Sequence, residues 1–119
     1  MSISIKQLHE HFVGEVSGID LREPLSADQA REIHEGMDRF GILVFHDQDL
    51  TDDQQVAYTR NFGEIELAVG SNVFKDDQRR LRLEMADVSN LDQDGQVLAR
   101  NDRRRMFGLG NRLWHSDSS

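Results

Sequence analysis

The chain has 119 residues, of which 37% are hydrophobic and 30% charged, and its mean hydropathy is −0.63. This length suits one domain, and the composition is not that of a disordered protein. The formal charge of −8 argues against a general nucleic-acid binder, and no apolar run approaches the length of a membrane span. The absence of cysteine excludes disulfides and thiolate sites, and we expect a cytoplasmic protein without a secretory signal.

The first half of the chain predicts two short strands, at residues 3–6 and 13–19, followed by a helix. Ser26 and Gln29 have the spacing of a capping box that would open a helix over 27–40. Four apolar residues recur there at helical spacing: Ala30, Ile33, Met37 and Phe40. Gly41 is expected to end this helix.

A further strand and a second helix follow. The apolar run 42–45 is too short for a helix and predicts a buried strand, after which His46 is expected to cap the strand end. Thr51 and Gln54 form a second capping box, which predicts a helix to about Phe62 with its apolar face at Val56, Tyr58 and Phe62. Gly63 is expected to end it.

The second half predicts loops and strands. The expected elements are a loop at 64–79, a strand at 81–91, a turn at Asp94-Gly95 returning through 97–98, a basic glycine-containing loop at 100–111 and a strand at 113–117. We therefore expect an α+β fold with helices early and strands late. Because a strand needs partners, we also expect further strands beyond Ser119, so that the chain is a fragment.

Charge is distributed unevenly. Residues 1–74 carry five basic and fourteen acidic side chains, whereas residues 75–119 carry nine basic, eight of them arginine, and eight acidic. Arginine forks suit anionic groups, so one interpretation is a rim that attracts a small anionic molecule. For any single arginine we favour the alternative, a solvated loop held by salt bridges.

His115-x-Asp117 is the sharpest chemical motif. Residues two apart on a strand point to the same face, so the imidazole and the carboxylate would converge as two metal ligands do. Sites with two histidines and one carboxylate bind non-haem Fe(II) and leave positions open for substrate chemistry. The bare motif is common, however, and by itself more often marks a surface pair.

Other candidate residues have simpler interpretations. His9 and His11 are expected to be exposed, with adventitious metal binding as the minor alternative, and His34 is expected at the boundary of its helix. Trp114 is expected to pack in a core rather than to stack on a substrate.

Five blocks in the same order resemble the taurine dioxygenase / 2,4-dichlorophenoxyacetate dioxygenase family. They comprise residues 14–25, 44–48, 50–64, 86–90 and 111–119. The blocks at 86–90 and 114–119 are most similar to the 2,4-dichlorophenoxyacetate branch. The resemblance implies the amino-terminal part of a double-stranded β-helix (jelly-roll) fold, with residues 1–119 forming part of a single catalytic domain.

The resemblance also implies site residues. His115 and Asp117 would bind Fe(II), and the third ligand, a downstream histidine, is absent from these residues. Asn111 matches a position that contacts substrate in the taurine enzyme, and Ser71 lies near another, where serine weakens anion recognition. His46 stands where relatives often have arginine. The groups that bind 2-oxoglutarate would all lie downstream.

The implied activity is that of an Fe(II)/2-oxoglutarate-dependent dioxygenase, which uses O2 to hydroxylate an aryloxyacetate such as 2,4-dichlorophenoxyacetate. The products would be a phenol, glyoxylate, succinate and CO2. One alternative is a taurine, alkylsulfonate or sulfate-ester dioxygenase. An alternative of another class is a small acidic binding module without enzymatic activity.

Residues 1–119 alone are expected to be inactive, because two ligands leave most of the metal's coordination sphere to water. The oligomeric state is left open, a homo-oligomer included.

Overall fold

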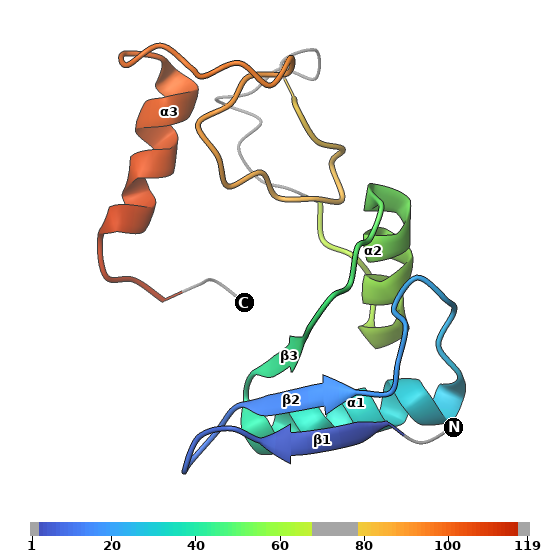
Figure 1. The fold of residues 1–119 in the computed structure, drawn as a ribbon. Coiled ribbons are helices and arrows are strands. Elements are labelled where there is room, and N and C mark those ends of the chain that lie inside the picture. Colours follow the sequence, from blue (N-terminus) through green and yellow to red (C-terminus); the bar gives the residue numbers. More distant parts are fainter. Residues whose placement is uncertain (1–2, 68–78, 117–119) are drawn as a thin grey trace. The chain divides into compact units, whose positions relative to one another are not determined.

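The computed structural model describes residues 3–67 and 79–116, which belong to two compact units, 1–65 and 66–119. The first unit contains a three-stranded sheet in the order β1-β2-β3 (Figure 1). Strand β1 (Ser4–Gln7) pairs antiparallel with β2 (Gly14–Ser17), and β3 (Leu43–Phe45) pairs parallel with β2. Because parallel neighbours need a crossover connection, helix α1 (Ala27–Phe40) joins β2 to β3 and lies along one face of the sheet.

The three predicted strands of this unit are confirmed. Strand β1 is shifted by one residue from its predicted position, and β2 and β3 are shorter than expected. Strand β2 begins only at Gly14, because Val13 has a φ of 66°, a left-handed conformation that a strand cannot contain. Strand β3 was expected to be buried, yet all three of its residues are half-exposed. Within the described residues the sheet has three strands, so β3 lies at its edge.

Helix α1 has the predicted bounds and caps. Ser26 Oγ accepts from the Gln29 backbone, Gln29 Oε1 accepts from the Ser26 backbone, and Gly41 ends the helix with a φ of 74°. Its buried residues are Ile33, Gly36 and Phe40, whereas Met37, predicted for the apolar face, is 46% exposed. Gly36, rather than Met37, faces the sheet. A Cβ at Gly36 would lie 2.8 Å from Ile5 Cδ1, so the absence of a side chain there lets the helix and the sheet approach closely.

Helix α2 (Asp52–Thr59) also carries the predicted capping box, formed by Thr51 and Gln54. It continues as a 3-10 turn, η1 (Arg60–Phe62), which ends at Gly63. Val56 is 3% exposed, and the Tyr58 ring meets Phe45 and Phe62 edge to face at 6.2 and 5.2 Å between centroids. Of the predicted apolar face, Val56 is buried and Tyr58 half-buried, whereas Phe62 is 37% exposed. Burial raises the pKa of the Tyr58 hydroxyl.

The second unit differs from the sequence prediction. The expected strand at 81–91 is absent from its described residues, where a turn closes from Met85 to Arg82 and only an isolated bridge joins Leu91 to Val97. The turn at Asp94-Gly95 is confirmed, with Gly95 at a φ of 78°. Local ion pairs and turns hold this backbone in place of a strand ladder.

A helix occupies the stretch predicted as a basic loop. Helix α3 (Arg103–Gly108) is followed by a 3-10 turn, η3 (Leu109–Arg112). Asp102 caps α3 by accepting from the Arg104 backbone at 2.8 Å, and arginine and methionine are strong helix formers, so the local sequence favours a helix despite Gly108.

The fold is α+β as predicted, but its order along the chain is not. In the described ranges all three named strands lie in the first unit, so the expectation of strands late in the sequence is wrong there. None of the helices in these ranges combines the length and apolar content that crossing a bilayer requires.

Candidate metal and substrate site

The second unit contains a cavity of about 750 Å³, within the range of small-molecule sites. Its walls come from residues 79–80, the stretch 85–90, and α3 with η3. Asn111 and His115, which the sequence suggested for substrate and metal binding, both line it. The structure therefore brings together the two predicted site residues that it describes.

The imidazole of His115 is oriented by its own segment. Its Nδ1 lies 2.7 Å from the carbonyl oxygen of Leu113. Because a carbonyl oxygen can only accept, we assign the proton to Nδ1 and the lone pair to Nε2, the arrangement typical of a metal-binding histidine. The donor chemistry of His115 therefore fits the expected iron site.

The remaining predicted site residues, Asp117 and Ser71, lie outside the described residues. Across the ranges that are described, no group of three or more His, Asp or Glu side chains is arranged to hold a metal ion. The strand predicted at 113–117 is not formed in its described part, although Leu113 has an extended φ of −99° and ψ of 143°. No described strand pairs with this segment, and an extended chain without a partner makes no ladder.

Two exposed apolar side chains directly precede His115 in the sequence. Trp114 is fully exposed and Leu113 is 73% exposed, so the expected core position of Trp114 is not found. Asn111, near the end of η3, is also exposed while lining the cavity.

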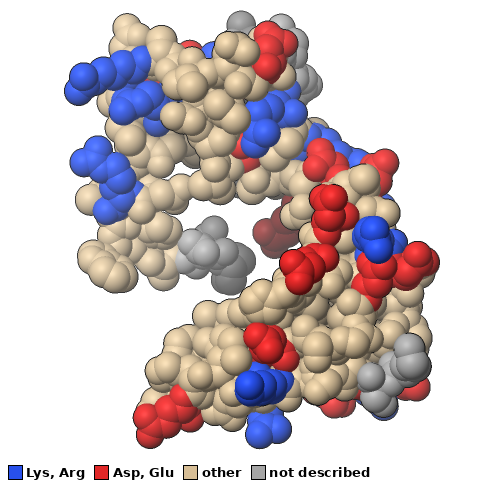
Figure 2. All heavy atoms as spheres, viewed as in Figure 1, with Lys and Arg blue, Asp and Glu red and all other residues tan. Residues whose placement is uncertain are grey.

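Arginines dominate the polar lining of the cavity. Figure 2 shows Lys and Arg side chains gathered over the second unit, whereas Asp and Glu prevail on the visible face of the first. Arg80 holds Asp87 through two hydrogen bonds of 2.8 and 3.0 Å, which lower the pKa of that carboxyl. Arg104 holds Asp102 in the same way at 2.9 and 3.0 Å, again lowering the carboxyl's pKa.

The salt-bridge interpretation of the arginine-rich half is confirmed for three of its arginines. Arg80 and Arg104 are salt-bridged, and so is Arg82, whose Nη2 lies 2.6 Å from a Glu84 oxygen. Arg105 differs: its Nη1 donates to the backbone carbonyl of Arg100 at 2.9 Å. Nothing in the sequence separated Arg105 from its neighbours, since its surroundings depend on the unpredicted helix α3.

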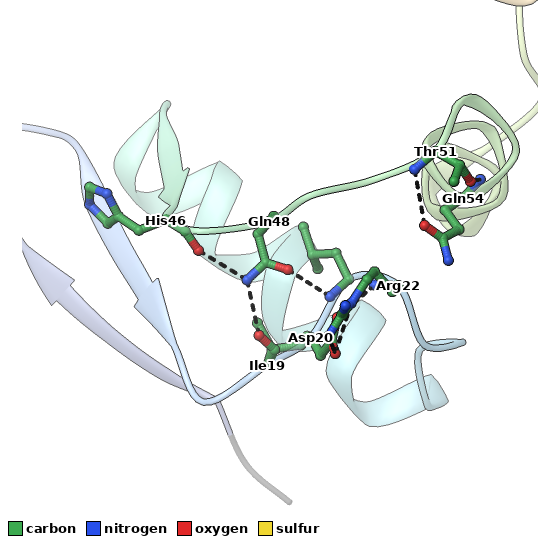
Figure 3. A network of polar contacts seen from close by, with 8 residues as sticks. Ile19, Asp20, Arg22, His46, Gln48, Thr51 and Gln54 are labelled. Carbon is green, nitrogen blue, oxygen red and sulfur yellow. Dashed lines mark hydrogen bonds and ion pairs between the residues drawn. The ribbon is translucent and has the colours of Figure 1, made fainter.

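A polar network braces the first unit (Figure 3). Gln48 accepts from the Leu21 backbone at 2.9 Å and donates to the carbonyls of Ile19 and His46 at 3.2 and 3.1 Å. The Asp20 carboxylate receives the Arg22 guanidinium at 2.8 Å, and bonds from the Arg22 side chain and backbone lower the pKa of Asp20 to about 2. These contacts fix the loop after β2 against the segment after β3.

The histidines of the first unit contact side chains or backbone groups of the same unit. His46 directly follows β3, and its Nε2 lies 3.1 Å from Glu15 Oε2 on β2. His9 and His11 are exposed as predicted, and the His11 backbone donates to His9 Nδ1 at 3.1 Å. His34 is exposed on α1, 3.7 Å from Asp38.

Comparisons with known proteins identify relatives. Residues 4–119 match the family model described as "Taurine catabolism dioxygenase TauD, TfdA family". The chain is 43% identical over its whole length to an alpha-ketoglutarate-dependent 2,4-dichlorophenoxyacetate dioxygenase of Cupriavidus pinatubonensis, and 41% identical to one of Burkholderia sp.. It spans 41% and 40% of these two proteins.

A solved structure is similar as well. The crystal structure of AAD-2 in complex with Mn(II) and N-oxalylglycine matches all of this chain with a TM-score of 0.86 and 51% sequence identity, over 41% of its own length. The match covers both the first unit and the segment that carries the cavity.

Proposed function

The chain belongs to the TauD/TfdA dioxygenase family, and from this we infer that it forms the amino-terminal portion of one Fe(II)/2-oxoglutarate-dependent dioxygenase domain. The proposed fold of that domain is a jelly roll, and the proposed substrate is an aryloxyacetate such as 2,4-dichlorophenoxyacetate. The observation that carries this proposal is the 43% identity to a 2,4-dichlorophenoxyacetate dioxygenase along the whole chain. It favours an enzyme over a small acidic binding module.

In this proposal, His115 and Asp117 bind the iron, and a downstream histidine completes the set. The support from this chain is the His115 imidazole, whose Nδ1 lies 2.7 Å from the Leu113 carbonyl oxygen, the backbone contact that orients many metal-binding histidines. Iron, when bound, supplies the O2 chemistry that couples the oxidative decarboxylation of 2-oxoglutarate to hydroxylation of the substrate. Mn(II) in the AAD-2 structure supports a metal requirement of this kind.

The protein's own contribution is to place one C–H bond of the substrate. Arginines on the cavity wall attract an anionic group, and Asn111 offers an amide that can hold it through hydrogen bonds. Hydroxylation of the carbon between the ether oxygen and the carboxylate gives a hemiacetal, which breaks its C–O bond to release a phenol and glyoxylate. A positioned substrate is needed because any other C–H bond would give another product.

A sulfonate or sulfate ester is the second candidate substrate, because the family model is named for taurine catabolism and the cationic guanidinium of arginine also attracts a sulfonate. Mass spectrometry of reactions of the full-length protein with Fe(II), 2-oxoglutarate and either 2,4-dichlorophenoxyacetate or taurine separates the two. We expect 2,4-dichlorophenol and glyoxylate with the first substrate. Exclusive release of sulfite from taurine would contradict the aryloxyacetate proposal.

A further inference from the structure

We propose that Arg105 binds the carboxylate of the molecule that occupies the cavity, and that it sets a preference for the anion over a neutral counterpart. The identity of that molecule, an aryloxyacetate, rests on the proposed function. The choice of Arg105 rests on the contacts of the cavity wall.

Four arginines line the cavity: Arg79, Arg80, Arg104 and Arg105. Two of them already hold carboxylates, since Arg80 pairs with Asp87 and Arg104 pairs with Asp102. Among the described lining residues Asp87 is the acidic one, and its charge is matched by Arg80 within the wall. The guanidinium of Arg105 adds a positive charge to this wall, which favours an anionic occupant.

Arg105 forms no ion pair with any carboxylate of the residues that the structure describes. Its Nη1 donates to the Arg100 carbonyl at 2.9 Å, and this bond orients the guanidinium without neutralising it. Over the same described ranges, Nε and Nη2 have no protein acceptor. These two donors form the planar fork that binds a carboxylate through two parallel bonds.

The burial of Arg105 strengthens this assignment. The side chain is half-buried on α3, where reduced solvent makes a charge-assisted hydrogen bond stronger than at an open surface. Arg103 stands on the same helix, is exposed and does not line the cavity. It carries the same charge two residues away and is therefore the matched control.

The test measures binding of phenoxyacetate and of neutral phenoxyacetamide to the full-length protein. Anaerobic isothermal titration calorimetry with Fe(II) and 2-oxoglutarate present gives both Kd values. We expect Arg105→Gln to raise the Kd of phenoxyacetate about tenfold, as loss of a charge-assisted bond should. The same variant should leave the Kd of phenoxyacetamide unchanged, and Arg103→Gln should leave both unchanged.

Three results would overturn the proposal. An unchanged Kd of phenoxyacetate in Arg105→Gln shows that the guanidinium does not touch the carboxylate. An equal loss for the amide shows a structural role, and an equal loss in Arg103→Gln shows a long-range charge effect. Circular dichroism of each variant confirms that it is folded before its affinity is compared.

Failure of the proposed function has a different signature. If the wild type binds phenoxyacetate in an Arg105-dependent way but forms no glyoxylate from it, the substrate assignment fails and the Arg105 contact stands. If glyoxylate forms while Arg105→Gln binds phenoxyacetate as tightly as the wild type, the substrate assignment stands and the Arg105 contact fails.

Discussion

The Nδ1 atom of His115 lies 2.7 Å from the carbonyl oxygen of Leu113, two residues earlier in the same segment. This contact orients the ring through its own backbone segment, as backbone carbonyls orient many metal-binding histidines. Orientation of this kind reduces the entropy lost on metal binding.

Replacing His115 tests whether its imidazole binds the metal. His115→Gln should weaken Mn(II) binding to the full-length protein by more than about 100-fold, because loss of a ligand costs at least as much as loss of its supporting contact. Electron paramagnetic resonance of free Mn(II) measures the affinity. His34→Gln, an exposed change on α1, is the control, and wild-type affinity in His115→Gln would refute the assignment.

Asn111 provides a separate test of the substrate side. Asn111→Ala removes an amide from the cavity wall and should raise KM for the aryloxyacetate by about tenfold, the value of one good hydrogen bond. Decarboxylation of 2-oxoglutarate without substrate should stay at the wild-type rate. Steady-state kinetics measure both, with the exposed Asn101→Ala as control. A fall in both rates would indicate a structural role instead.

The helix cap of α1 makes a prediction about stability. Ser26→Ala removes the Oγ that accepts from the Gln29 backbone at 3.1 Å and should lower the free energy of unfolding by about 1 kcal/mol. Urea unfolding followed by circular dichroism measures the change. Ser17→Ala, at the exposed end of β2, should have little effect. A loss of similar size in both variants would mean that the cap is not responsible.

The contact between Asp20 and Arg22 should make the stability of the first unit depend on pH in the acidic range. Hydrogen bonds from the Arg22 side chain and backbone lower the pKa of Asp20 from 3.8 to about 2, so the folded state favours the ionised form. The stabilisation is therefore complete above pH 3.8 and is lost as the pH falls toward 2. Carboxyl-carbon NMR should show this pKa directly. Arg22→Ala should raise it part of the way to 3.8, whereas Arg31→Ala should not move it.

How far the sequence predicted the fold depends on where the local signals lie. The caps at Ser26 and Thr51 act within four residues, so α1 and α2 could be placed from sequence alone. The strands of the first unit were located, but β2 was predicted to begin too early, because the positive φ of Val13 comes from the turn around it rather than from its residue type.

The second unit shows the limit of the same reasoning. Alternation suggested a strand at 81–91, but strands form only with partners, and the ion pairs of Arg80 and Arg82 close local turns instead. The cap at Asp102 was visible in the sequence and could have predicted α3. His115 and Asn111 could be named as candidate site residues from a motif and a family resemblance. Arg105 could be told apart from the neighbouring arginines only by its contacts in the folded chain.

The close packing around Gly14 gives the sharpest test of the first unit. A Cβ at this buried position would lie 2.7 Å from Ile5 Cγ2 and 2.9 Å from both Leu43 Cδ2 and Phe40 Cδ2. Gly14→Ala would therefore push against β1, β3 and α1 at once, and overpacking of this kind costs about 1–3 kcal/mol.

Gly108 is the matched control for that substitution. It lies in α3, and a Cβ added there would meet no atom within 4 Å, so Gly108→Ala adds helix propensity without a clash. We expect Gly108→Ala to raise the free energy of unfolding by about 0.5–1 kcal/mol, and Gly14→Ala to lower it. Urea unfolding of the two variants measures these opposite signs. A stable Gly14→Ala protein would mean that β1, β3 and α1 do not meet at Gly14 as closely as the structure places them, because only a wider spacing would admit the methyl group.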